Sequence, residues 1–217
     1  MKKLILLSLS VFTLAVSAIS QSPESLKGKE ILDKVAAKTK TYSSIKADFS
    51  FTLENLQAKV TDTYDGSILV KGDKYKASIM GADTYFDGTT MWMHMKDINE
   101  VNISGADMID EESLNPATIF TMYEKGYRYL HSGEATIKGK KVDIVELFPE
   151  DRNKPFSRIK LFIYKDNLQF ARIEQIGKDG NNYIINIKNM KPNVAADNSM
   201  FIFDPAKHPG VEIIDLR

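Results

Sequence analysis

The side chains that could do chemistry in this sequence are few and scattered. Its three histidines, His94, His131 and His208, have no carboxylate or second histidine at metal-ligand spacing. We therefore predict no metal site and expect the histidines at the surface or at strand edges. The sequence has no cysteine, which removes disulfides, thiolate metal ligands and the cysteine of a lipid-anchored lipoprotein.

The acidic residues offer no catalytic or calcium-binding constellation either. The stretch from Asp107 to Glu112 lacks the alternating oxygen ligands and the bidentate acid of a calcium loop, so we interpret it as the solvated start of a helix. The sequence signatures of hydrolases, nucleotide-binding loops and dinucleotide sites are missing. We therefore predict that the protein is not an enzyme and carries no cofactor.

The elements that would position a site begin after an export signal. Two lysines precede an apolar run over residues 4–16, and small residues follow at Ala18 and Ser20. This is the pattern of a cleaved secretory signal peptide; a membrane anchor is the alternative, although the run is short for a bilayer span. We expect residues 1–20 to be the signal peptide and residues 21–217 to form a single domain.

The charge balance excludes some classes of partner. Loss of the two signal lysines takes the formal net charge from 0 to −2. So small a net charge gives no indication that the protein binds nucleic acid or an anionic membrane surface. About 197 mature residues are enough to build one large hydrophobic core.

Hydrophobic periodicity predicts an amphipathic helix followed by a sheet. Apolar residues recur at helical spacing between Ser22 and Tyr42, and alternation with a period of two starts at Ile45. Turn signals such as Asp179-Gly180 separate the later strands by short connections, so we predict an antiparallel meander. The predicted strands are 45–51, 63–70, 75–79, 91–95, 101–103, 142–148, 159–164, 170–176 and 183–188.

A second helix is predicted inside this meander. Acidic residues precede Pro116, which suits the first turn of a helix, and a broad apolar stripe follows. We expect this helix at about residues 116–125, where it would cover the sheet as a lid.

One face of the predicted sheet is apolar along several strands. Alternate residues of the strands at 75–79, 91–95, 159–164 and 183–188 are large and apolar, whereas the intervening positions are mostly polar. A curved sheet with few helices has more concave apolar area than the helices can fill, which favours a cavity. Tight core packing is the alternative, because stripes of methionine and aromatic residues are usually core, although methionine also suits adaptable binding surfaces.

Several short segments, taken in their order and spacing, carry a family resemblance. They are Tyr42-Ser43-Ser44-Ile45-Lys46-Ala47-Asp48-Phe49, Gly66-Ser67-Ile68-Leu69-Val70-Lys71, Asp87-Gly88-Thr89-Thr90-Met91-Trp92-Met93, Asn115-Pro116 and Phe201-Ile202-Phe203-Asp204-Pro205. In these segments the chain resembles the LolA-type periplasmic lipoprotein carrier family, over essentially the whole mature chain. The resemblance implies a mainly β (α+β) fold: an unclosed antiparallel β-barrel, or half-barrel, covered by two or three α-helices that enclose an apolar cavity.

The resemblance also implies a function. The expected ligands are the acyl chains of lipoproteins, received from an inner-membrane lipoprotein-releasing transporter and passed to an outer-membrane acceptor. It implies a monomer located in the periplasm, with no nucleic-acid partner. The alternative is a periplasmic lipid-binding or envelope-stress sensor protein on the same fold.

The resemblance and the apolar face together give the residues expected to line an acyl-chain cavity. They are Leu32, Val35, Phe49, Phe51, Ile68, Val70, Tyr75, Ile79, Met91, Met93, Met95, Ile119, Phe120, Met122, Tyr123, Leu161, Ile163 and Ile185. Trp92 is expected on the opposite face, against a neighbouring element. The chain departs from the family at Gly72, where members carry an arginine tied to lid opening; the nearest cations here are Lys71 and Lys74.

The signal-peptide interpretation predicts a defined cleavage. The exported protein should begin after Ala18 or after Ser20, because small residues at these positions suit signal peptidase. Intact-mass spectrometry of the exported protein measures this directly. A mass that still includes residues 1–17 would contradict the prediction.

Overall fold

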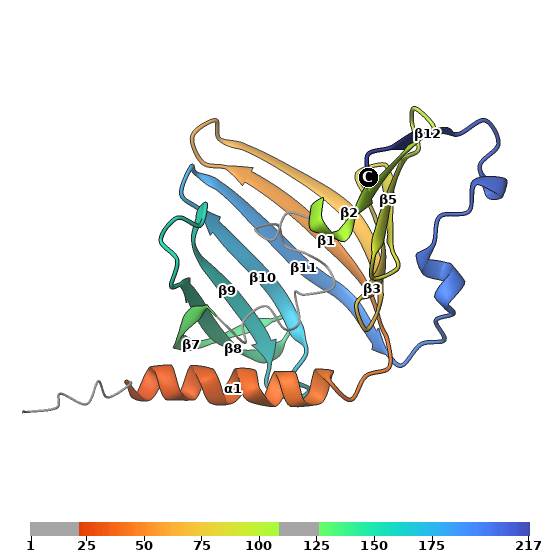
Figure 1. Ribbon diagram of the computed structural model, residues 1–217. Coiled ribbons are helices and arrows are strands. Elements are labelled where there is room, and N and C mark those ends of the chain that lie inside the picture. Colours follow the sequence, from red (N-terminus) through yellow and green to blue (C-terminus); the bar gives the residue numbers. More distant parts are fainter. Residues whose placement is uncertain (1–21, 109–125) are drawn as a thin grey trace, which may run out of the picture.

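One open sheet and one α-helix make up most of the part of the chain that the computed structural model describes, residues 22–108 and 126–217 (Figure 1). The second predicted helix, at about 116–125, lies outside these residues. The elements are α1 Pro23–Thr39, β1 Ile45–Asn55, β2 Val60–Lys71, β3 Lys74–Ile79, β4 Ala82–Phe86, β5 Thr90–Met95, β6 Glu100–Gly105, η1 Ala106–Met108, β7 Tyr127–Ile137, β8 Lys140–Pro149, β9 Phe156–Tyr164, β10 Phe170–Gly177, β11 Asn181–Pro192, η3 Asn198–Phe201, η4 Pro205–Lys207 and β12 Glu212–Asp215.

The α1 helix begins and packs as its sequence predicts. The Ser22 side chain caps the first turn by accepting a hydrogen bond from the Ser25 backbone N–H, and Pro23 occupies the first turn. Its buried stripe includes Ile31, Leu32, Val35 and Ala36, which join the main hydrophobic core. The helix crosses one end of the sheet and contacts β7.

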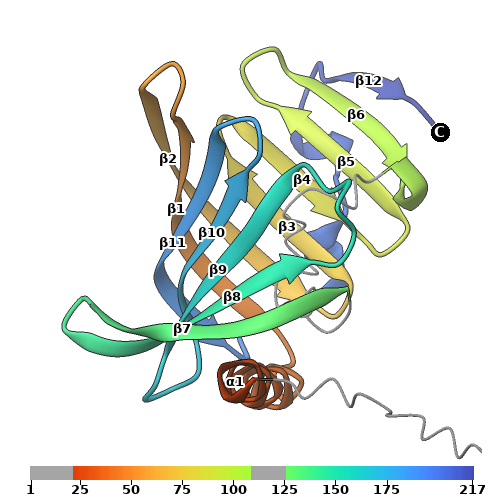
Figure 2. The same cartoon turned by 90° about the vertical axis from the view of Figure 1, so that its left-hand side faces the viewer.

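The twelve strands form one continuous sheet in the order β12-β6-β5-β4-β3-β2-β1-β11-β10-β9-β8-β7. Figure 2 shows that the sheet is strongly curved, with β7 and β12 at its two edges. The β1 strand pairs with β2 on one side and with β11 on the other. This pairing joins the strands that precede β7 to those that follow it.

The expected half-barrel fold with an antiparallel sheet and a lid of two or three helices is wrong. The sheet is mixed, because β12 runs parallel to β6, and the described residues contain a single α-helix. The parallel pair has a topological cause. Short hairpins force antiparallel pairing, whereas β12 follows the long segment from Asn193 to Val211, which crosses from β11 to the far edge of the sheet.

Cross-strand pairing places the predicted apolar residues on one face of the sheet. One row runs Met91, Phe86, Tyr75, Val70 and Ile45 across five strands. Another row runs Phe51, Ile185, Ile173, Leu161 and Val145. The face that carries these rows also packs against α1, and we refer to it as the concave face.

The opposite, convex face has its own small core under the carboxy-terminal segment. Tyr85 of β4, Val101 of β6 and Phe203 are buried together, and Trp92 packs against them. Trp92 therefore lies on the other face from Met91 and Met93 and contacts a neighbouring element, as predicted. The same segment buries Phe201 completely.

Gly28 of α1 gives a prediction about how the helix sits on β7. A Cβ atom at Gly28 would lie 3.1 Å from the backbone nitrogen of His131 and 3.3 Å from the carbonyl carbon of Leu130. In an exposed helix, Gly→Ala raises stability by up to about 1 kcal/mol. Here Gly28→Ala should instead lower the free energy of unfolding, by about 1 to 2 kcal/mol, because the added methyl pushes the helix from the strand.

Urea denaturation of Gly28→Ala beside Lys27→Ala measures this effect. Lys27 is the adjacent exposed helical residue, so its substitution should change stability little. An increase in stability for Gly28→Ala would show that the helix does not depend on close approach to β7.

Candidate functional site

The concave face is the candidate functional site, and most of the predicted lining residues lie on it. Ten of them meet in or against the main hydrophobic core: Leu32, Val35, Phe49, Ile68, Val70, Tyr75, Met91, Leu161, Ile163 and Ile185. Cross-strand pairing places four others on the same face without joining them to that core: Phe51, Ile79, Met93 and Met95. The remaining four, Ile119, Phe120, Met122 and Tyr123, lie outside the described residues.

Burial divides this face into two parts. At the end that α1 covers, residues such as Val145, Leu161 and Ile159 are fully buried. Over the middle of the sheet, apolar side chains lie on the same face but stay partly exposed: Phe49, Phe51, Ile79, Met95, Ile185 and Ile187. We call this second part the open strip. Its rim is more exposed still, with 37% exposure for both Tyr64 and Met93.

Aromatic contacts shape the open strip locally. Phe51 stacks on Tyr183 with ring centroids 6.1 Å apart. The ring of Phe49 lies across Gly66 of β2, so closely that a Cβ atom there would be 2.6 Å from the ring. A glycine at this position therefore lets an aromatic side chain lie flat on the sheet, which widens the apolar surface.

Two phenol groups lie among the apolar residues of the concave face. Burial raises the pKa of Tyr75 above its ordinary value, and its hydroxyl faces the Met91 sulfur at 3.7 Å. Burial likewise raises the pKa of Tyr127. Both phenols therefore stay neutral in the ordinary pH range, which suits an apolar rather than an ionic ligand.

One of the three histidines, His94, is buried, contrary to expectation, whereas His131 is half-buried on the edge strand β7. His131 pairs with Asp143 at 2.9 Å between β7 and β8, close to where α1 crosses. His94 is 4% exposed and lies on the convex face between Phe203 and His208. Among the described residues, no three side chains of the metal-binding types gather in one place.

Sequence reasoning missed some residues of the concave face. Tyr64 has the same parity as Ile68 and Val70 in a predicted strand, so alternation alone could have found it. Phe86 was missed because β4 was not predicted. Gln175 was missed for a different reason, because a polar residue does not indicate an apolar face. In the structure it lies opposite Ile159 and Tyr183 on the concave face and is 7% exposed.

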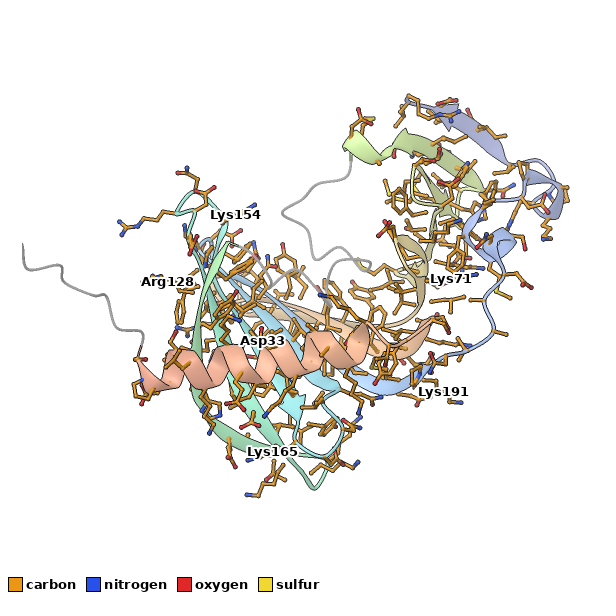
Figure 3. The ribbon with its side chains drawn as sticks, turned by 60° about the horizontal axis from the view of Figure 1, so that its bottom comes forward. Asp33, Lys71, Arg128, Lys154, Lys165 and Lys191 are labelled. Atoms are coloured by element: carbon orange, nitrogen blue, oxygen red, sulfur yellow. The ribbon has the colours of Figure 1, made fainter. Side chains whose placement is uncertain are left out.

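Lys71, the cation next to Gly72, is held by the carboxy-terminal segment. Gly72 lies in the β2–β3 turn with a φ of +56°. Lys71 donates from Nζ to the Ala196 carbonyl at 2.8 Å and contacts Asn198 Oδ1 at 3.3 Å. Figure 3 shows Lys71 and Lys191 beside the carboxy-terminal segment, so Lys71 is engaged on the convex face.

Comparison with known proteins now identifies the family. A model of the outer membrane lipoprotein carrier protein LolA matches residues 16–170. The chain belongs to this family. The match ends at the start of β10, so β11 and the carboxy-terminal segment lie beyond it. Among curated proteins, none matches the chain significantly.

Solved structures are similar to the chain at low sequence identity, and the first of these shares its fold. An uncharacterized conserved protein from Thermus thermophilus is 11% identical, with a TM-score of 0.57 over 87% of this chain and 99% of that one. LprF from Mycobacterium bovis is 14% identical, with a TM-score of 0.47 over 81% and 97%. A LolA superfamily protein from Nitrosomonas europaea is 14% identical, with a TM-score of 0.45 over 82% and 98%.

Gln175 gives a prediction about the chemistry of the concave face. Its Oε1 is buried and has no hydrogen-bond partner among the described residues. Removing such an atom avoids a desolvation cost, so Gln175→Met should raise the free energy of unfolding by about 1 kcal/mol. Chemical denaturation measures the change.

Gln175→Glu is the matched control, because it keeps the shape and buries a charge, and it should lower stability. A loss of stability for Gln175→Met would show that the amide has a polar partner on this face. The surroundings of β10 would then not be apolar.

Proposed function

We propose that the protein is a periplasmic carrier that binds the acyl chains of lipoproteins on the open strip and ferries them from the inner to the outer membrane. The observation that supports this most is the partial exposure of large apolar side chains along the middle of the concave face. A tightly packed core would bury these side chains, whereas a carrier needs them accessible to its ligand.

The chemistry of the open strip suits a long hydrocarbon chain. Its surface is aromatic, methionine and branched aliphatic, and methionine adapts to ligands of irregular shape. The phenols of Tyr75 and Tyr127 stay neutral and so offer no charge to an ionic ligand. The family description, outer membrane lipoprotein carrier protein, supports lipoproteins rather than free fatty acids as the source of these chains.

The energetics explain why a carrier is needed. Burying an acyl chain contributes roughly 0.8 kcal/mol per CH₂, or about 13 kcal/mol for a chain of about 16 carbons, so a lipoprotein does not leave a membrane for water unaided. A carrier must shelter the chain without holding it irreversibly. An incompletely covered strip meets both needs, since the ligand itself completes the coverage.

We also propose that the protein is exported and that it is not an enzyme. The signal-like residues 1–20 would direct the protein to the periplasm, the compartment that a carrier between the two membranes must cross. Within residues 22–108 and 126–217, no helix is both long and apolar enough to cross a bilayer. We expect ligand binding without turnover, an inner-membrane transporter as donor and an outer-membrane acceptor.

Two adjacent isoleucines of β11 test the proposal. Ile185 faces Phe51 and Ile173 on the concave face, whereas Ile184 faces Thr52 and Glu174 on the convex face. Both are partly exposed, so either can be replaced by lysine without burying a charge in the core. Ile185→Lys should weaken binding at least about tenfold because the ammonium lies in the path of the acyl chain. Ile184→Lys should leave binding unchanged.

The measurement is fluorescence polarization of a labelled tripalmitoylated Cys-Ser peptide, with the same peptide lacking acyl chains as ligand control. A second measurement follows transfer of the acylated peptide from donor to acceptor liposomes. Equal binding by the two variants would reject the open strip as the site. Binding of phospholipid but not of the acylated peptide would reject the carrier role in favour of a lipid-binding protein.

A further inference from the structure

A second recessed site lies on the convex face, away from the open strip. The segment from Asn193 to Val211, here called the strap, runs along this face at a distance from the sheet (Figure 1). Together with β1, β2 and β3 it lines a groove of about 870 Å³. This volume lies within the usual range for small-molecule sites.

The strap is held in place at several points, so the groove has a built wall. The Asn193 backbone N–H donates to the Ser44 carbonyl at 2.8 Å, and the Ser44 hydroxyl donates to the Val194 carbonyl at 2.6 Å. Farther along, Phe201 is completely buried and Phe203 is 5% exposed. The side chains between these anchors line the groove.

The floor of the groove carries a row of lysines. Lys191 of β11 lies directly opposite Lys46 of β1, Lys46 lies opposite Leu69 of β2, and Leu69 lies opposite Lys76 of β3. All four residues line the groove. Like charges directly opposite each other across strands destabilise a sheet, so the Lys46–Lys191 pair costs stability unless an anion lies between the two ammonium groups.

Asp48 lies on the same face of β1 two residues from Lys46, but the acidic side chains of the described residues do not pair with this row. In the part of the chain that the structure describes, neither Lys46 nor Lys191 forms an ion pair. Asp204 lines the groove but pairs with Lys207 at 3.2 Å, and Asp83 on the same face of the sheet pairs with Lys96 at 2.7 Å. The local charge is therefore positive, although the charge of the whole chain is balanced.

The strap side of the groove has an apolar part. Met200 and Ile202 of the strap line the groove and are 42% and 43% exposed. Leu69 adds an apolar patch to the floor between Lys46 and Lys76. An anion with an apolar part would satisfy both surfaces at once.

An extended peptide is a poor fit to this groove. Peptides that bind to sheets usually add a strand to a free edge, but β1, β2 and β3 are each paired on both sides. Side chains alone must therefore recognise the ligand. Ammonium groups act as compact point charges and suit phosphate.

We propose that this groove binds the phosphate of an anionic phospholipid headgroup, held between Lys46 and Lys191, with the adjoining glycerol and first acyl carbons against Met200 and Ile202. The site is on the opposite face from the open strip, so it does not depend on acyl-chain binding there. It would place the convex face of the carrier against individual anionic lipids.

Isothermal titration calorimetry tests the proposal with three probes below micelle-forming concentration. They are dihexanoyl-phosphatidylglycerol, dihexanoyl-phosphatidylcholine and inorganic phosphate. The wild-type protein should bind the anionic lipid at least about tenfold more tightly than the other two, because charge-assisted contacts and the apolar part of the strap side both contribute. Added salt should weaken this binding.

The double variant Lys46→Gln/Lys191→Gln should lose at least about tenfold in affinity for the anionic lipid. Its melting temperature should stay the same or rise, because the repulsion between the two lysines is removed. The matched control is Lys27→Gln/Lys141→Gln, which removes the same charge from exposed positions outside the groove and should bind as the wild type does. Binding of the acylated peptide to the open strip should be unaffected in both variants.

Three results would overturn the proposal. Retained affinity in the Lys46→Gln/Lys191→Gln variant would remove the lysine row from the site. Equal affinity for phosphatidylcholine would show that the charge is not recognised. Phosphate binding as tight as that of the anionic lipid would assign the groove to a free anion and exclude the lipid.

Discussion

The structure depends on the β1 strand being paired along its whole length on both sides. All eleven residues of β1 have a partner on β2, and its two ends pair with the two ends of β11. Because side chains alternate between faces, this double pairing sets which residues of the flanking strands face α1 and which face the strap. A shift of one residue between β1 and β11 would put Phe51 and Ile185 on opposite faces, and a shift between β1 and β2 would do the same to Phe51 and Tyr64.

The two faces of the sheet are therefore built from adjacent residues of the same strands, and the two sets of residues differ in chemistry. In β11, Ile185 belongs to the open strip, whereas Ile184 faces outward. In β1, Ile45 and Ala47 are buried on the concave side, whereas Lys46 between them lines the convex groove. One sheet can thus shelter hydrocarbon on one side and meet charged groups on the other, because the period of two separates the residues.

Much of this arrangement follows from the sequence, and the exceptions have identifiable causes. The helix at the amino terminus and nine strands follow from periodicity, and parity alone puts the apolar residues on one face. The β4 strand was missed because the turn before it uses Met80 with a φ of 52° followed by Gly81, and methionine is not a turn signal. The β7 strand was missed because an irregularity between His131 and Gly133 breaks its alternation. The β12 strand is short and pairs with a distant partner.

The predicted lid of two or three helices was the least successful part of the prediction, again because local pattern does not determine long-range packing. A periodic stripe indicates that a helix could bury one face, but not which surface covers it or how completely. The structure buries the β8 and β9 residues near α1 and leaves Phe51 and Ile187 partly exposed, a division that no single-residue pattern encodes.

The convex groove could not be predicted from composition either, because a balanced total charge says nothing about where the charges lie. Lys46 and Lys191 are far apart in sequence and become neighbours only through the pairing of β1 with β11. Long-range pairing, rather than local pattern, thus determines both the open part of the apolar face and the charge of the opposite one.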